Sequence, residues 1–179
     1  MDNSDADTIL AEARIALEEG RGIYEGNLIW RLHALAEAHN EKARAFFIEA
    51  MQILHDDAWR YEMLCDIGFH YDLGDDPDTI TKIRGMLLSD PDEDVRNAAA
   101  MILGIQSSWP DQALYRAMLN DVQKGVRLVA FESLLRLSGM SNKNYTHAYA
   151  QAKAGKISIT PESLKALVGD KFSDLIQDQ

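Results

Sequence analysis

The stretch LSDPDEDVRNAAAMILG, residues 88–104, decides the fold that we predict for this chain. Its Asp-Pro pair and the acids that follow are typical of a turn that leads into the first turn of a helix. Val95, Ala99 and Leu103 then recur every four residues, which gives one apolar stripe along a helix. The three consecutive alanines favour helix and allow a neighbouring helix to approach closely. The stretch therefore predicts an acidic turn followed by a packed helix.

Similar runs recur on both sides of this stretch, each with a hydrophobic residue before an arginine. The arginines are Arg31, Arg60, Arg96 and Arg127, at successive intervals of 29, 36 and 31 residues. Two further apolar stripes have the same spacing, and they consist of Trp59, Met63, Ile67 and of Val126, Ala130, Leu134. Intervals of this size are typical of stacked helical repeats. Repeat stacks present a surface rather than an enclosed site, so the pattern favours a binding function.

Residues 88–104 resemble a HEAT repeat, of the short kind also found in phycobilisome lyases, and related segments cover roughly residues 7–139. The resemblance implies an all-α fold, a right-handed α-solenoid of about five stacked helix pairs that binds protein and in a few members carries chemistry. In this family an arginine at the repeated position commonly bonds an acidic turn residue of the neighbouring repeat. The resemblance thus implies a structural ladder of Arg60, Arg96 and Arg127, with partners among Asp57, Asp92, Asp94 and Asp121.

The pattern predicts one domain over residues 1–179 and no β-sheet. Its repeats span about 7–38, 41–71, 77–106 and 110–138, and capping helices follow over about 143–176. The individual helices are expected at 5–19, 22–38, 41–54, 57–71, 77–88, 93–106, 110–119, 123–138, 143–154 and 161–176. Gly74, Gly104 and Gly139 are candidates for helix C-caps. The last helix, amphipathic and preceded by Thr160, is expected to close the end of the stack.

Charge is distributed unevenly along the chain, whose net charge is −11. Residues 1–120 carry 23 acidic and 10 basic side chains, whereas residues 121–179 carry 6 and 8. The aspartates gather in turns, where they either cap the following helices or form an acidic edge that attracts a basic partner. Such an edge repels phosphate, so nucleic-acid binding is disfavoured.

The location of the protein is predicted from what its sequence lacks. The first residues have no basic start and no apolar run of a signal peptide, and no stretch is apolar enough to cross a bilayer. The single cysteine, Cys65, gives no disulfide framework. These features predict a cytoplasmic protein without a membrane partner.

Catalytic signals are few. Asp66 and His70 lie four residues apart beside Cys65 and could share a helix face, as an acid–base pair or part of a metal site. Nothing completes a ligand set, and a capping or surface role is the more common one for such a pair. We therefore expect no enzyme, cofactor or metal. HEAT-like DNA glycosylases use tryptophans, but with a basic surface. Trp30, Trp59 and Trp109 are interpreted as core or turn residues, with Trp109 the most exposed.

The second helix of each pair lines the concave face in stacks of this kind. Side chains expected off the core stripe there, and hence available to a partner, are Tyr61, Asp66, His70, Tyr71, Asn97, Met101 and Glu132. The sequence favours a non-enzymatic binding module, most concretely a small bacterial inhibitor or immunity protein for a basic protein partner. An adaptor or scaffold subunit is the alternative, and an enzyme of the bilin-lyase or glycosylase kind is least favoured.

Overall fold

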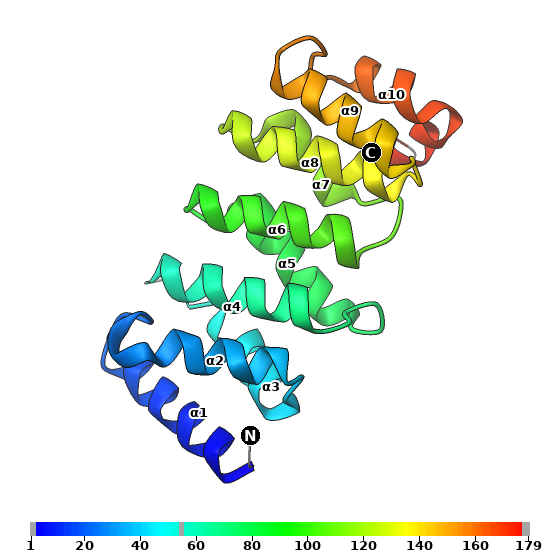
Figure 1. Cartoon of the computed structure of the whole chain (residues 1–179). Coiled ribbons are helices and arrows are strands. Elements are labelled where there is room, and N and C mark those ends of the chain that lie inside the picture. Colours follow the sequence, from blue (N-terminus) through cyan, green and yellow to red (C-terminus); the bar gives the residue numbers. More distant parts are fainter. Residues whose placement is uncertain (1–2, 54–55, 177–179) are drawn as a thin grey trace. The chain divides into compact units, whose positions relative to one another are not determined.

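The computed structural model describes residues 3–53 and 56–176 of the chain (Figure 1). Over these residues it contains ten α-helices and two short 3-10 helices, and no strand. The all-α prediction is confirmed. The chain divides into two compact units, Met1–Asp72 and Leu73–Gln179, and each is described by itself. None of the described helices is both long enough and apolar enough to cross a bilayer.

The first unit contains four α-helices, which are α1 (Asn3–Glu18), α2 (Leu28–Glu37), α3 (Glu41–Ala50) and α4 (Asp57–His70). Consecutive helices form antiparallel pairs, α1 with α2 and α3 with α4, and the like members of the two pairs also contact each other. Phe46, Phe47 and Trp59 fill the interior, with the Phe46 and Trp59 rings edge to face at 6.3 Å. The indole N–H of Trp59 donates to the Arg21 carbonyl at 3.0 Å, so this large side chain is buried without an unpaired donor.

Two helix boundaries predicted in this unit are wrong. The helix expected from residue 22 begins only at Leu28, after the 3-10 turn η1 (Glu25–Asn27). Gly26 and Asn27 have φ of 61° and 62°, a left-handed conformation that glycine and asparagine adopt at least cost and that ends helical continuity. The helix expected over 41–54 ends at Ala50 and is followed by a turn, and residue 54 lies outside the described residues.

The second unit begins with two helix pairs, α5 (Pro77–Ser89) with α6 (Glu93–Gln106) and α7 (Gln112–Asn120) with α8 (Lys124–Leu137). Helix α6 packs along α8, and α5 packs on α7 (Figure 1). Aspartates cap three of these helices through backbone N–H groups, and they are Asp76, Asp92 and Asp111. The predicted capping role of the turn aspartates is thus confirmed for Asp76 and Asp92. Because Asp111 is a cap, α7 begins at Gln112 rather than at residue 110.

Gly104 lies inside α6, so its prediction as a C-cap is wrong. A Cβ atom at this position would lie 2.4 Å from Ser133 Oγ and 3.0 Å from Ser133 Cα. The Ser133 hydroxyl in turn donates to the Ala100 carbonyl at 2.9 Å. The missing side chain therefore lets α8 approach the backbone of α6. Gly139, with φ of 80°, follows the last residues of α8 as the predicted C-cap.

The end of the second unit consists of α9 (Asn142–Lys153), α10 (Pro161–Val168) and the 3-10 segment η2 (Gly169–Leu175). The continuous helix predicted over 161–176 is wrong, because Gly169 adopts φ of 63° and ends α10. The Phe172 ring packs edge to face on Tyr115, and Gln112 Nε2 donates to the Leu175 carbonyl at 3.0 Å. Through these contacts η2 packs against α7.

Candidate functional site

A cavity of about 480 Å³ lies between α2 and α4 of the first unit, and we call it the α2–α4 cavity. Helix α2 presents one face to it because Leu28, Leu32 and Leu35 bury the opposite side of that helix. The residues that line the cavity are Trp30, His33, Ala34 and Glu37 from α2 and Cys65, Asp66, Phe69 and His70 from α4. No lysine or arginine is among them, so the cavity holds carboxylates without a neutralising permanent cation.

Asp66 is the buried charge of the cavity, with only 2% of its surface exposed. Its Oδ1 lies 2.6 Å from His33 Nδ1, whereas its Oδ2 has no hydrogen-bond partner among the described residues. Burial raises the pKa of Asp66 to about 6, and the interaction with His33 opposes part of that rise. A buried carboxylate oxygen without a donor is costly in a folded protein and is uncommon.

His33 lies between two carboxylates, one near each ring nitrogen. Its Nε2 is 3.7 Å from Glu62 Oε2, on the side away from Asp66. Glu62 is itself held by the Tyr24 hydroxyl, which donates to Oε1 at 2.6 Å, and this hydrogen bond raises the pKa of Tyr24 to about 12. The imidazole therefore has a hydrogen bond at Nδ1 and a carboxylate near Nε2, and Asp66 Oδ2 has no donor among the described residues.

Exposed aromatic rings form the rim of the cavity. Trp30 is 69% exposed and Phe69 is 48% exposed, and the Trp30 ring meets His33 edge to face at 5.9 Å. Aromatic walls above a buried carboxylate suit a group that has an apolar stem and a cationic end, because the ring faces attract cations and cover methylene groups. Lysine and arginine side chains have this form.

The side chains that line the cavity include a thiol, imidazoles and carboxyl groups. Burial raises the pKa of the Cys65 thiol to about 12, so the thiol stays protonated and is a poor nucleophile near neutral pH. Within the described ranges, no group of three or more histidine, cysteine, aspartate or glutamate side chains could hold a metal ion. The cavity presents carboxyl groups, imidazoles and aromatic rings to a ligand.

The structure gives the predicted partner-binding residues different surroundings. Tyr61 is 36% exposed, and His70 and Asp66 both line the α2–α4 cavity. Asp66 and Tyr71 are buried, so the expectation that these two lie off the core is wrong, whereas a partner-binding role for Asp66 stays a prediction. Helix α4 is covered by both α2 and α3, which widens its buried face. The Tyr71 hydroxyl donates to the Asn40 carbonyl at 2.9 Å. Asn97, Met101 and Glu132 belong to the second unit.

Several residues of the cavity were not predicted. Trp30 was interpreted as a core or turn residue and Trp109 as the most exposed tryptophan, yet Trp30 is the more exposed of the two. His33 rather than His70 is the hydrogen-bond partner of Asp66. The spacing of Trp30, His33 and Glu37 places them on one helical face, and that pattern could have indicated the site.

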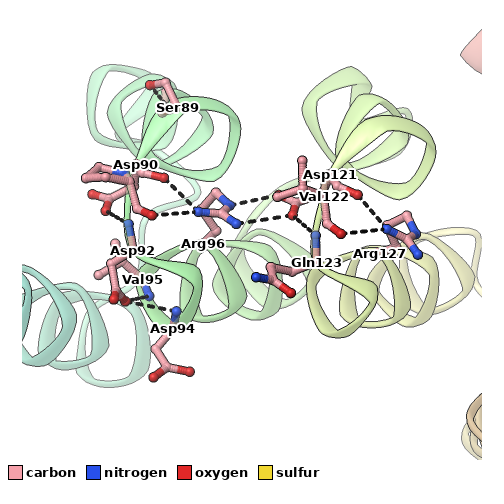
Figure 2. A network of polar contacts seen from close by, with 12 residues as sticks. Ser89, Asp90, Asp92, Asp94, Val95, Arg96, Asp121, Val122, Gln123 and Arg127 are labelled. Carbon is pink, nitrogen blue, oxygen red and sulfur yellow. Dashed lines mark hydrogen bonds and ion pairs between the residues drawn. The ribbon is translucent and has the colours of Figure 1, made fainter.

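A second polar cluster, which we call the turn network, joins the turn before α6 to the turn before α8 (Figure 2). Arg96 Nε donates to Asp121 Oδ2 at 2.8 Å and its Nη2 donates to Asp121 Oδ1 at 3.2 Å. Its Nη1 donates to the carbonyls of Asp90 and Pro91 at 2.9 and 3.2 Å. Arg96 is only 8% exposed, and the hydrogen bonds to Asp121 raise its pKa above the usual arginine value. Every charge in this pair is therefore matched.

The other two arginines of the expected ladder also contact turn backbones. Arg60 is 2% exposed and its Nη1 donates to the Ile53 carbonyl at 3.2 Å. Arg127 Nη1 donates to the carbonyls of Asp121 and Val122 at 2.6 and 3.2 Å. Arg31, in contrast, forms an ion pair with Glu12 on the surface.

Comparison of the chain with protein-family models, with curated proteins and with solved structures found no match.

Proposed function

We propose that this chain is a non-enzymatic protein-interaction module of the HEAT-like α-solenoid kind, and that it binds a basic protein partner in the cytoplasm. Support for the solenoid comes from the second unit, where two consecutive helix pairs pack like on like and the Arg96–Asp121 pair links their turns. Support for a basic partner comes from the net charge of −11 and from the chemistry of the α2–α4 cavity.

The observation that carries the proposal is the unpaired Oδ2 of Asp66 below exposed aromatic rings. A lysine or arginine side chain from the partner would pack its methylene groups against Trp30 and Phe69 and direct its N–H groups toward Asp66 and Glu37. The incoming cation would supply the donor that Asp66 Oδ2 does not find among the described residues. An anchor of this kind, aromatic at the rim and charged at its base, is typical of binding hot spots.

An inhibitor or immunity protein for a basic toxin is the most concrete form of this function. Such a protein acts by covering its partner, which needs charge complementarity and no chemistry. The protonated Cys65 thiol argues against nucleophilic catalysis at the same place. Electrostatic attraction between an acidic module and a basic partner would also speed association at low ionic strength.

The test is affinity purification from a lysate of the source organism, with the retained proteins identified by mass spectrometry. The bait is compared with a Trp30→Ala/Phe69→Ala variant and with Val122→Ala, which removes a side chain that is 84% exposed in the second unit. We expect a basic protein on the unchanged bait and on Val122→Ala, lost from the double variant and weakened by moderate salt. Equal retention by all three baits would exclude the α2–α4 cavity as the binding site.

A further inference from the structure

Arg127 repeats the backbone contacts of Arg96 but lacks its carboxylate. In both residues Nη1 donates to the carbonyls of the residues six and five positions earlier. Arg96 uses its remaining edge, Nε and Nη2, to bind Asp121. The same edge of Arg127 has no hydrogen-bond partner within residues 3–53 and 56–176. In Figure 2 the dashed lines from Arg127 lead only to the turn of Asp121 and Val122.

The free edge of Arg127 has a defined geometry. The two hydrogen bonds from Nη1 hold the guanidinium against the turn, so little side-chain entropy remains to be lost on binding. A guanidinium edge with two parallel N–H groups matches the two oxygens of a carboxylate, as the Arg96–Asp121 pair demonstrates within the same unit. Arg127 therefore carries the same pair of N–H groups that Arg96 uses to bind Asp121.

A cavity of about 220 Å³ adjoins Arg127, and it is small in comparison with usual ligand pockets. The residues that line it are Lys124, Arg127, Ala152, Gly155, Ile157, Ser158 and Ile159. Lys124 adds a second positive charge, and the isoleucines offer apolar contact to a short methylene stem. The volume suits one acidic side chain better than a larger ligand.

The end of α9 borders this cavity, and its carbonyl groups could repel an anion. Two of them are already engaged, because Gly155 N–H donates to the Ala152 carbonyl at 3.0 Å and Lys156 N–H donates to the Gln151 carbonyl at 2.8 Å. Gly155 has φ of 73°, which allows this closure of the helix end. The charge balance over residues 121–179, 8 basic against 6 acidic side chains, also favours an anion here.

We propose that Arg127 and Lys124 form a binding site for a carboxylate, that of an aspartate or glutamate side chain on a partner chain. This site is separate from the α2–α4 cavity and does not depend on the function proposed for it. The carboxylate would take the place beside Arg127 that Asp121 takes beside Arg96. A partner segment with an acidic side chain would thus continue the turn network by one step.

The test uses the full chain and ¹⁵N-edited NMR of the arginine Nε–H groups. A capped peptide, acetyl-Gly-Asp-Gly-amide, is titrated at constant ionic strength, with the Asn peptide, sodium acetate and sodium chloride as comparison ligands. We expect a saturable shift of the Arg127 Nε–H signal with the Asp peptide and weaker binding of acetate. Neither the Asn peptide nor chloride should give a saturable shift. Acetate binding as tight as that of the peptide would overturn the assignment to a protein side chain.

Variants separate binding from folding. Arg127→Lys loses the paired N–H groups and should weaken the Asp peptide about tenfold or more, because one charge-assisted hydrogen bond is lost. Lys124→Gln, an exposed position that makes none of the turn contacts, should weaken it by a smaller factor. Because Arg127→Lys has no Nε–H group at this position, the titrations of these two variants follow the backbone amide signals of residues 155–159. Thermal unfolding of each variant checks that it is folded. Arg136→Gln, an exposed arginine of α8, should leave the affinity unchanged. No saturable response in the unchanged protein, or equal affinities in all variants, would overturn the proposal.

Discussion

The turn network and the α2–α4 cavity each bury charge, but they treat it differently. In the turn network both partners of the Arg96–Asp121 pair are present and both ends of the carboxylate are bonded. In the cavity Asp66 is at least as deeply buried, yet one of its oxygens has no partner among the described residues. The satisfied Arg96–Asp121 pair links two turns, whereas the unpaired oxygen of Asp66 is the feature on which the proposed binding function rests. We therefore expect the Arg96–Asp121 pair to matter for stability and Asp66 to matter for binding.

Removing Arg96 should have the largest effect, because it leaves Asp121 buried without its cation. We expect Arg96→Ala to lower the free energy of unfolding by about 3–5 kcal/mol, measured by urea denaturation. Arg116→Ala, at an exposed position of the neighbouring α7, is the control and should change stability by no more than about 0.5 kcal/mol. Similar small losses in both variants would mean that the turn network does little to hold the second unit together.

Removing the buried charge of the α2–α4 cavity should stabilise the chain, and the gain should depend on pH. Because the pKa of Asp66 is about 6 when folded and 3.8 ordinarily, the folded chain binds the extra proton between these values. The free energy of unfolding contributed by Asp66 therefore falls as pH rises from about 4 to 6, by about 2–3 kcal/mol. Asp66→Asn should remove this fall.

Urea denaturation of Asp66→Asn and of the unchanged protein at several pH values from 4 to 7 measures the difference, which should grow with pH in favour of the variant. His33, Glu62 and His70 face the same carboxylate and remain in both proteins. Glu37→Gln, at an exposed position of the same cavity, is the control. A stability difference that does not change with pH would contradict the unpaired state of Asp66.

The close contact between α6 and α8 should contribute to the stability of the second unit in addition to the charged pair. Gly104→Ala places a methyl group against Ser133 and should cost about 1–3 kcal/mol of unfolding free energy. Gly85→Ala, in α5, meets no atom within 4 Å and should instead stabilise the chain by up to about 1 kcal/mol, since alanine favours helix. Thermal unfolding of the two variants should thus shift in opposite directions.

The smallest effect on stability is expected at the rim of the cavity. Trp30→Ala removes a large side chain that is 69% exposed, so the free energy of unfolding should change by about 0.5 kcal/mol or less. Trp59→Ala, at a fully buried tryptophan, should cost about 3–5 kcal/mol. If urea denaturation showed a large loss of unfolding free energy for Trp30→Ala, this residue would be part of the core and not of a binding surface.

The helices could be predicted from the sequence because each depends on local signals. The stripe of Val95, Ala99 and Leu103 and the cap at Asp92 lie within one short stretch. The predicted helix boundaries were wrong where a left-handed residue interrupts the helix, as at Gly26, Asn27 and Gly169. These residues can adopt several backbone conformations, so the sequence alone does not show which one occurs.

The candidate site could be predicted only in part. The pattern drew attention to Asp66, Cys65 and His70 because they are close in sequence, but the partner of Asp66 is His33, 33 positions away on another helix. Tyr71 was misplaced for the same reason, since it follows the end of α4 and packs against Phe47 of α3 and the Asn40 carbonyl. Pairing across helices follows from how the helices pack, and one helix's periodicity does not contain that information.

We propose that the α2–α4 cavity binds a cationic side chain, and NMR titration of the Asp66 carboxyl carbon tests this proposal most directly. The pKa of Asp66 is followed in the full chain alone, with acetyl-Gly-Arg-Gly-amide, and with the norleucine peptide of the same length. We expect a pKa of about 6 in the free chain that falls with the arginine peptide and stays unchanged with norleucine. A pKa that is the same in all three samples would contradict the claim.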